Sequence, residues 1–92
     1  MTEIDVTSRS EEDGWTCTVR LRDANGSSTS HEVRVGREDL ARLAPGADDP
    51  VDLVRGSFEF LLAREPKESI LLSFDLPVIG RYFPEYEREI RA

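Results

Sequence analysis

The residues best suited to chemistry in this chain are its single cysteine and its single histidine. Cys17 and His31 fall on two predicted strands that pair through a hairpin, where they would be diagonal neighbours on the inner face of a sheet. A thiol beside an imidazole can act as an activated nucleophile. No spacing motif accompanies the pair, and a buried free cysteine usually behaves as a small hydrophobe. An enzyme that uses Cys17 and His31 is therefore only the third hypothesis, and we expect a protein that is not an enzyme.

Ligands for metals and cofactors are equally sparse. One cysteine and one histidine cannot complete a tetrahedral zinc shell. The adjacent Asp48 and Asp49 lack the alternating oxygen ligands of a calcium loop, and Asp49 precedes Pro50 as a helix cap would. The glycines are scattered, so no phosphate-binding loop is present. We predict no catalytic, cofactor or metal site.

Three arginines on the outer face of the predicted sheet form a local basic patch. Arg20, Arg22 and Arg34 lie among threonines and near Glu32, in a chain with 12 basic and 19 acidic residues and a net charge of -7. A sheet that binds single-stranded nucleic acid would also present aromatic side chains, and Trp15 has the parity of the inner face. Ion pairing with Glu32 is the simpler interpretation, so no nucleic-acid partner is expected here.

The pattern of residues 51–82 suggests DNA binding as an alternative function. Their three helical pieces, separated by short turns, would suit a helix-turn-helix DNA-binding regulator. The last helix of that motif needs basic or amide residues at its start. Here residues 77–80 are Pro-Val-Ile-Gly and Arg81 is the one cation, so DNA binding stays the second hypothesis.

The elements that position these residues begin with three strands. Residues 2–8 and 15–22 alternate between apolar and polar side chains, as half-buried strands do. A two-residue hairpin loop at Asn25-Gly26 would place the inward residues of one strand opposite outward residues of the next. A three-residue loop of residues 24–26 restores the parity. It predicts a bulged hairpin that pairs Trp15 with Val35, Cys17 with Val33 and Val19 with His31.

The periodicity becomes helical after Gly36. Short helical pieces are predicted over residues 37–44, from Asp49 to about Arg64, from the turn at residues 75–77 through Tyr82, and over residues 85–90. Residues 67–74 allow another short helix. Pro84 must break a continuous last helix. The predicted fold is α+β, a single domain over residues 1–92 with a three-stranded antiparallel β-meander (1–36) followed by three to four short helices packed on one face (37–92).

Composition limits the class of protein. A chain of 92 residues, 38% hydrophobic and 34% charged, is a globular domain with one core. The lone cysteine excludes a disulfide scaffold, the first residues lack the pattern of a signal peptide, and no apolar run approaches a membrane span. Eleven of the twelve basic residues are arginine, a bias typical of bacteria with high genomic GC content. We expect an acidic, cytoplasmic bacterial protein with no membrane partner.

Aromatic residues are concentrated in the helical half. Six of the seven lie in the last thirty-five residues, which is more apolar surface than one face of a three-stranded sheet can cover. We expect the surplus, Phe60, Tyr82, Phe83 and Tyr86, to form an interface for a protein partner or a homodimer. The alternative is that these side chains pack in the core of a monomer. The leading hypothesis is a small non-catalytic protein-interaction or regulatory module.

The same half carries a sequence resemblance. The run Ser57-Phe-Glu-Phe-Leu-Leu62, followed by Arg64-Glu-Pro66, Ser69-Ile-Leu71, Phe74, Leu76, Ile79 and Tyr82-Phe-Pro84, resembles the signature of a family of short bacterial proteins without an assigned function. The resemblance covers about the C-terminal 40% of the chain. It implies no activity, ligand or site residue.

Overall fold

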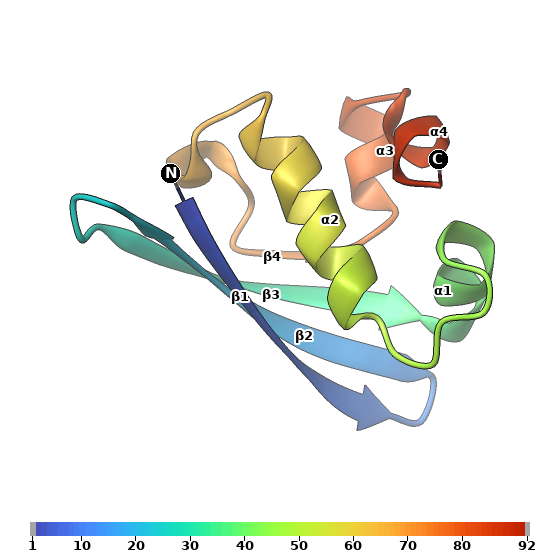
Figure 1. The fold of residues 1–92 in the computed structure, drawn as a ribbon. Coiled ribbons are helices and arrows are strands. Elements are labelled where there is room, and N and C mark those ends of the chain that lie inside the picture. Colours follow the sequence, from blue (N-terminus) through green and yellow to red (C-terminus); the bar gives the residue numbers. More distant parts are fainter. Residues whose placement is uncertain (1, 92) are drawn as a thin grey trace.

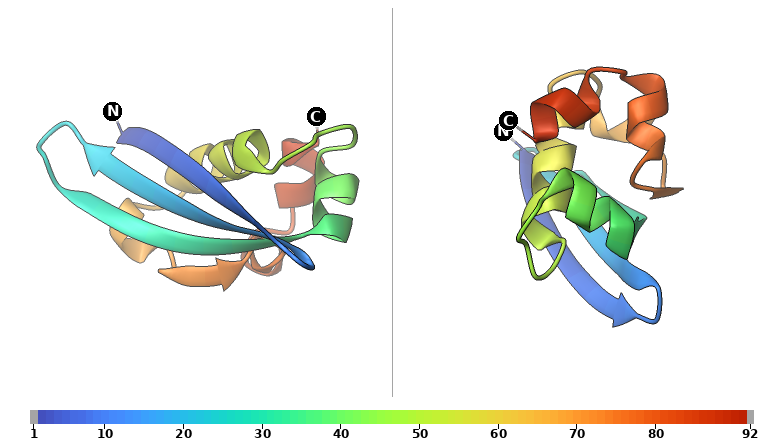
Figure 2. Two further views of the ribbon diagram at one scale, coloured as in Figure 1. Left: turned by 90° about the horizontal axis from the view of Figure 1, so that it is seen from below. Right: turned by 90° about the vertical axis from the view of Figure 1, so that its right-hand side faces the viewer.

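The computed structural model describes residues 2–91 as an α+β fold with its helices on one face of a sheet (Figure 1). The sheet has the strand order β1-β2-β3-β4, with β4 at one edge (Figure 2). The elements in chain order are β1 (Thr2–Glu11), β2 (Gly14–Asp23), β3 (Ser28–Gly36), α1 (Arg37–Leu43), α2 (Val51–Leu62), the 3-10 helix η1 (Lys67–Ser69), β4 (Ser73–Asp75), α3 (Val78–Tyr82) and α4 (Tyr86–Ile90).

The first three strands form the predicted antiparallel meander, and β2 and β3 pair in the predicted register. Trp15 pairs with Val35, Cys17 with Val33 and Val19 with His31. This register brings the apolar side chains of β2 and β3 to one face.

The loop between β2 and β3 confirms the three-residue hairpin. The Gly26 N–H donates to the Asp23 carbonyl at 2.9 Å, and the Asp23 N–H donates to the Ser27 carbonyl at 2.9 Å. Gly26 has a φ of 89°, the left-handed conformation that a bulge of this kind requires.

The segment 67–74, predicted to be helical, is instead the short η1 followed by strand β4. The Leu72 carbonyl accepts the Glu32 N–H at 2.8 Å, and the Leu76 N–H donates to the Arg34 carbonyl at 2.9 Å, so β4 runs parallel to β3. In Ser73-Phe74-Asp75 only the middle side chain is buried, which is the period of a strand. Three residues are too few to show that period in the sequence, and the pairing with β3 decides the structure.

Helix α2 covers the inner face of the sheet and carries the chain from β3 towards β4 (Figure 1). Its buried side chains meet the apolar face of β2 and β3 in one core. Phe58 is fully buried between His31 and Phe74, with ring centroids 5.5 and 6.1 Å away. The helix begins with Pro50 as its cap and not Asp49, although the Asp49 carboxylate still accepts the Val51 N–H at 2.9 Å.

A buried lysine joins the β2–β3 hairpin to η1. Lys67, the only lysine, extends its ammonium group to the carboxylates of Asp23 and Glu68 and lies 2.8 Å from the Ser27 hydroxyl. Its hydrogen bonds lower the pKa of Asp23 and of Glu68, and those two carboxylates raise the pKa of Lys67. A buried ammonium group needs such partners, because desolvation opposes its charge.

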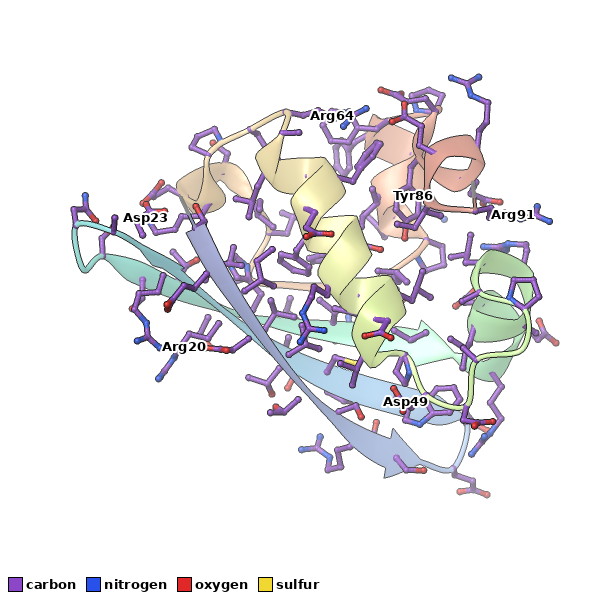
Figure 3. All side chains as sticks on the ribbon, in the orientation of Figure 1. Arg20, Asp23, Asp49, Arg64, Tyr86 and Arg91 are labelled. Carbon is purple, nitrogen blue, oxygen red and sulfur yellow. The ribbon has the colours of Figure 1, made fainter. Side chains whose placement is uncertain are left out.

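The C-terminal helices pack on α2. Helix α3 ends at Tyr82, and Pro84 separates it from α4, as predicted. Figure 3 shows Tyr86 between α2 and the C-terminal helices, where its hydroxyl lies 2.6 Å from the Ser57 hydroxyl. Arg64 lies over the Phe60 ring at 3.6 Å and pairs with Glu85 at 3.3 Å. None of the helices within residues 2–91 has the length and apolar character needed to cross a bilayer.

The hairpin predicts a specific effect of Gly26→Ala. A Cβ at Gly26 would meet no neighbouring atom within 4 Å, so the cost comes only from the left-handed backbone. We expect Gly26→Ala to lower the free energy of unfolding by about 1 to 2 kcal/mol. Gly26→Asn should cost less, because asparagine tolerates this conformation better. Urea denaturation of the two variants checks the prediction, and equal stability of Gly26→Ala and the unaltered chain would contradict it.

Candidate protein-interaction site

The predicted nucleophile pair lies inside the core. Cys17 and His31 are both buried. His31 Nδ1 lies 2.8 Å from the Leu71 carbonyl, which can only accept, so Nδ1 carries the proton. In the neutral ring Nε2 then accepts from the Thr29 hydroxyl at 2.8 Å. Both ring nitrogens are therefore hydrogen-bonded within the protein and are not free to contact a substrate.

Burial also suppresses the reactivity of the thiol. It raises the pKa of Cys17 to about 11, and the negative charge of Asp49 contributes in the same direction. A thiol with this pKa is protonated at neutral pH and is a poor nucleophile. Among residues 2–91, no three side chains of the metal-binding types are grouped to hold an ion.

The predicted basic patch is on the open face of the sheet but is partly neutralised. Figure 3 shows Arg20 on the side of the sheet away from the helices. Arg22 pairs with Asp5 at 3.6 Å, and Arg34 pairs with Asp75 at 2.6 Å and with Glu32 at 3.9 Å. The predicted ion pair with Glu32 is confirmed for Arg34.

The segment that suggested a helix-turn-helix has a different order of elements. Within residues 51–82, all of which the structure describes, η1 and β4 separate α2 from α3. In a helix-turn-helix, the element before α3 across a short turn would be a helix. Here that element is the strand β4, and α3 itself has five residues. The two consecutive helices that the motif needs are absent from this segment.

The four residues predicted as an interface divide into two pairs. Phe60 and Tyr86 are buried, and their rings lie 5.3 Å apart where α4 packs on α2. Phe83 is partly buried against Phe60 at 5.8 Å, whereas Tyr82 is 67% exposed. Phe60 and Tyr86 therefore belong to the core, and the remaining pair lies at the surface.

Tyr82 and Phe83 line an apolar groove, which we call the α3 groove. It encloses about 300 Å³ between the end of α2, the segment leading into β4, and α3. Leu71, 47% exposed, lies at this groove, and Leu72 beside it in sequence is 67% exposed. The lining residues are Leu61, Glu65, Ser69, Ile70, Leu71, Phe74, Val78, Ile79, Tyr82 and Phe83.

The groove borders an open edge of the sheet. Strand β4 pairs with β3 on one side, and no further strand of residues 2–91 pairs with its other side (Figure 2). Leu72 and Leu76 bond to β3 through their backbones. Because backbone groups alternate in direction along a strand, the N–H and C=O groups of Ser73 and Asp75 face the open edge.

A second hollow adjoins the groove at Val78, and we call it the acidic hollow. It lies where the β1–β2 turn, the end of β3, α1 and α3 meet, and it is lined by five carboxylates and two guanidinium groups, a formal net charge of -3. These charged residues are Glu11, Glu12, Asp13, Asp39, Asp75, Arg34 and Arg81.

One sequence signal could have located this site. Ile70, Leu71 and Leu72 are three consecutive apolar residues, and in an extended segment they cannot all face one core. Ile70 is buried and the other two are exposed. The concentration of aromatic residues in the helical half indicated the correct region, but it did not distinguish the exposed Tyr82 from the buried Tyr86.

Comparison of the chain with known protein families, with curated proteins and with solved structures finds no match in any of the three. The resemblance of residues 57–84 to a family of short bacterial proteins therefore stays a prediction.

Two buried acids predict that the fold weakens at alkaline pH. Burial raises the pKa of Cys17 from 9.0 to about 11 and that of Tyr86 from 10.0 to about 12. The unfolded chain therefore loses these protons first. The contribution of both groups is fully present below about pH 9 and is lost between pH 9 and 12, with a slope that approaches about 1.4 kcal/mol per pH unit for each group.

Denaturation measured from pH 8 to pH 10.5 checks this prediction. In Cys17→Ala we expect a smaller loss of stability between pH 9 and 10 than in the unaltered chain. The remaining buried acid is Tyr86, which ionises at a higher pH than cysteine in the unfolded chain. An unchanged pH dependence in Cys17→Ala would contradict the assignment to the thiol.

Proposed function

We propose that this protein is a small, non-catalytic interaction module that binds an apolar segment of another protein in the α3 groove. The observation that carries the proposal is the exposure of Tyr82 and Leu71 at an apolar groove of about 300 Å³. Large apolar side chains grouped around a hollow mark binding surfaces more often than isolated exposed ones do.

The chemistry of the groove supports binding over catalysis. Its polar groups among the described residues are the side chains of Glu65 and Ser69 and the hydroxyl of Tyr82. The Ser69 hydroxyl has no hydrogen bond to Glu65, and a serine that is not bonded to a base is a weak nucleophile. The buried His31 makes its two hydrogen bonds to Thr29 and Leu71. The groove can therefore hold an apolar group and orient it, without a residue equipped to transform it.

Tyr82 has the properties of an anchor residue at an interface. Tyrosine offers a large amphipathic surface with few rotatable bonds, and it is enriched among the residues that dominate binding energy. It projects from the short helix α3, which is held by the buried Ile79 and by the chain break at Pro84. A fixed anchor loses less conformational entropy when a partner binds.

Selection of peptide ligands tests this proposal. We expect a random peptide library displayed on phage to yield binders, and NMR spectra to place them at Leu71, Val78 and Tyr82. Tyr82→Ala should weaken binding about 30-fold, equivalent to about 2 kcal/mol, because it removes the exposed anchor.

Thr18→Ala serves as the matched control, since Thr18 is exposed on the open face of the sheet. It should leave both affinity and the mapped surface unchanged. Binders that map to the open face of the sheet, or that bind Tyr82→Ala as tightly as the unaltered chain, would contradict the proposal.

A further inference from the structure

We propose that the partner segment is an extended strand that pairs with the open edge of β4 and carries basic residues to the acidic hollow. This inference rests on the proposed use of the α3 groove and adds the conformation and charge of the partner. Three features carry it: the free backbone of β4, the position of the groove and the charge beside it.

The backbone of β4 can accept another strand. The N–H and C=O groups of Ser73 and Asp75 face the open edge, as the bonds of Leu72 and Leu76 to β3 require. An extended peptide can satisfy these groups by adding one strand to the sheet. Such pairing supplies affinity that does not depend on the peptide sequence.

The groove lies where alternate side chains of an added strand would point. Phe74 faces the helices and lines the groove, whereas Ser73 and Asp75 are exposed. Neighbouring strands share this alternation, so every second side chain of an added strand would lie on the helix side, beside Leu71 and Tyr82. Apolar residues at those positions would fill the groove.

The charge of the acidic hollow indicates that the partner carries basic residues. The acidic hollow begins at Asp75, the last residue of β4, so one end of an added strand would meet it. Glu12 and Asp13 line the hollow, and neither side chain has an ion-pair partner among the described residues. Lysine or arginine at that end of the peptide would be attracted to a net charge of -3.

The same charge argues against a second copy of the chain as the occupant. Pairing of two β4 edges would join two chains that each carry a net charge of -7 and an acidic hollow. Like charges placed opposite each other oppose association. A basic segment of a different protein is the complementary partner.

Synthetic peptides test both parts of the inference. Each peptide alternates leucine and threonine over six residues, with three arginines, three serines or three glutamates at one end. Versions charged at the N-terminal end and at the C-terminal end cover both strand directions. A fluorescent label at the other end allows the affinity to be measured by anisotropy.

We expect the better arginine peptide to bind at least tenfold more tightly than its glutamate counterpart in 50 mM salt. The difference should shrink in 500 mM salt, because salt screens charges near the surface. N-methylation that removes the backbone N–H groups facing β4 should weaken the arginine peptide at least tenfold. These are the threonine N–H groups in the peptide charged at its N-terminal end, which would pair antiparallel, and the leucine N–H groups in the peptide charged at its C-terminal end, which would pair parallel.

Two double variants with the same loss of charge locate the effect. Glu12→Gln with Asp13→Asn should reduce the preference for arginine several-fold and leave the serine peptide unaffected. Asp48→Asn with Glu59→Gln, which removes two exposed charges from the α1–α2 loop and from α2, should preserve the preference.

The contrary outcomes separate this inference from the proposed function. Equal affinity of the arginine and glutamate peptides would overturn the basic partner, and full binding by the N-methylated peptide would overturn strand pairing, while the groove kept its role. Sedimentation that shows self-association abolished by Tyr82→Ala would make a second copy the occupant and overturn the inference. Failure of every peptide to bind, with Tyr82→Ala indistinguishable from the unaltered chain, would defeat both proposals.

Discussion

The parallel pairing of β4 with β3 is the constraint on which the rest of the structure depends. A parallel strand cannot follow its neighbour through a tight turn, so the chain must cross over the sheet before it returns. Helix α2 makes that crossing and brings Phe58 onto the apolar face of β2 and β3. The pairing also places Phe74 in the core, where it packs against Phe58.

Polar side chains reinforce this pairing along its length. His31 holds the Leu71 carbonyl, and Arg34 reaches Asp75 from the open face. Lys67 ties the start of the segment to the β2–β3 hairpin through Asp23. These contacts join residues about forty positions apart, and each depends on the correct placement of η1 and β4. The polar groups of His31 and Lys67 are therefore occupied by contacts that stabilise the fold.

The surface proposed for function is a consequence of the same arrangement. Since β4 is the last strand of the sheet, one edge of its backbone has no partner strand within residues 2–91, and Leu71 and Leu72 beside it are exposed. Helix α4 packs on α2 through Tyr86, so it covers Phe60 and leaves Tyr82 exposed. The apolar groove thus lies at this edge, between the segment that leads into β4 and helix α3.

Local patterns in the sequence determined much of this protein. The alternation of β2, the parity of Cys17 against Val33 and the turn residues around Gly26 define the hairpin, because each rests on neighbours in the chain. The proline at position 84 likewise marks the break between α3 and α4. The prediction that Cys17 and His31 face the core has the same origin.

Only the tertiary structure decided the fate of residues 67–74 and of the aromatic residues. A three-residue strand has too short a pattern to be distinguished from a helical turn, and β4 forms because β3 offers it an edge. Tyr82 and Tyr86 are four residues apart and chemically identical. One is buried against Ser57 and the other exposed, because Pro84 redirects the chain between them and α2 covers only one side. The sequence therefore indicated that surplus apolar surface exists, and long-range packing decided where it lies.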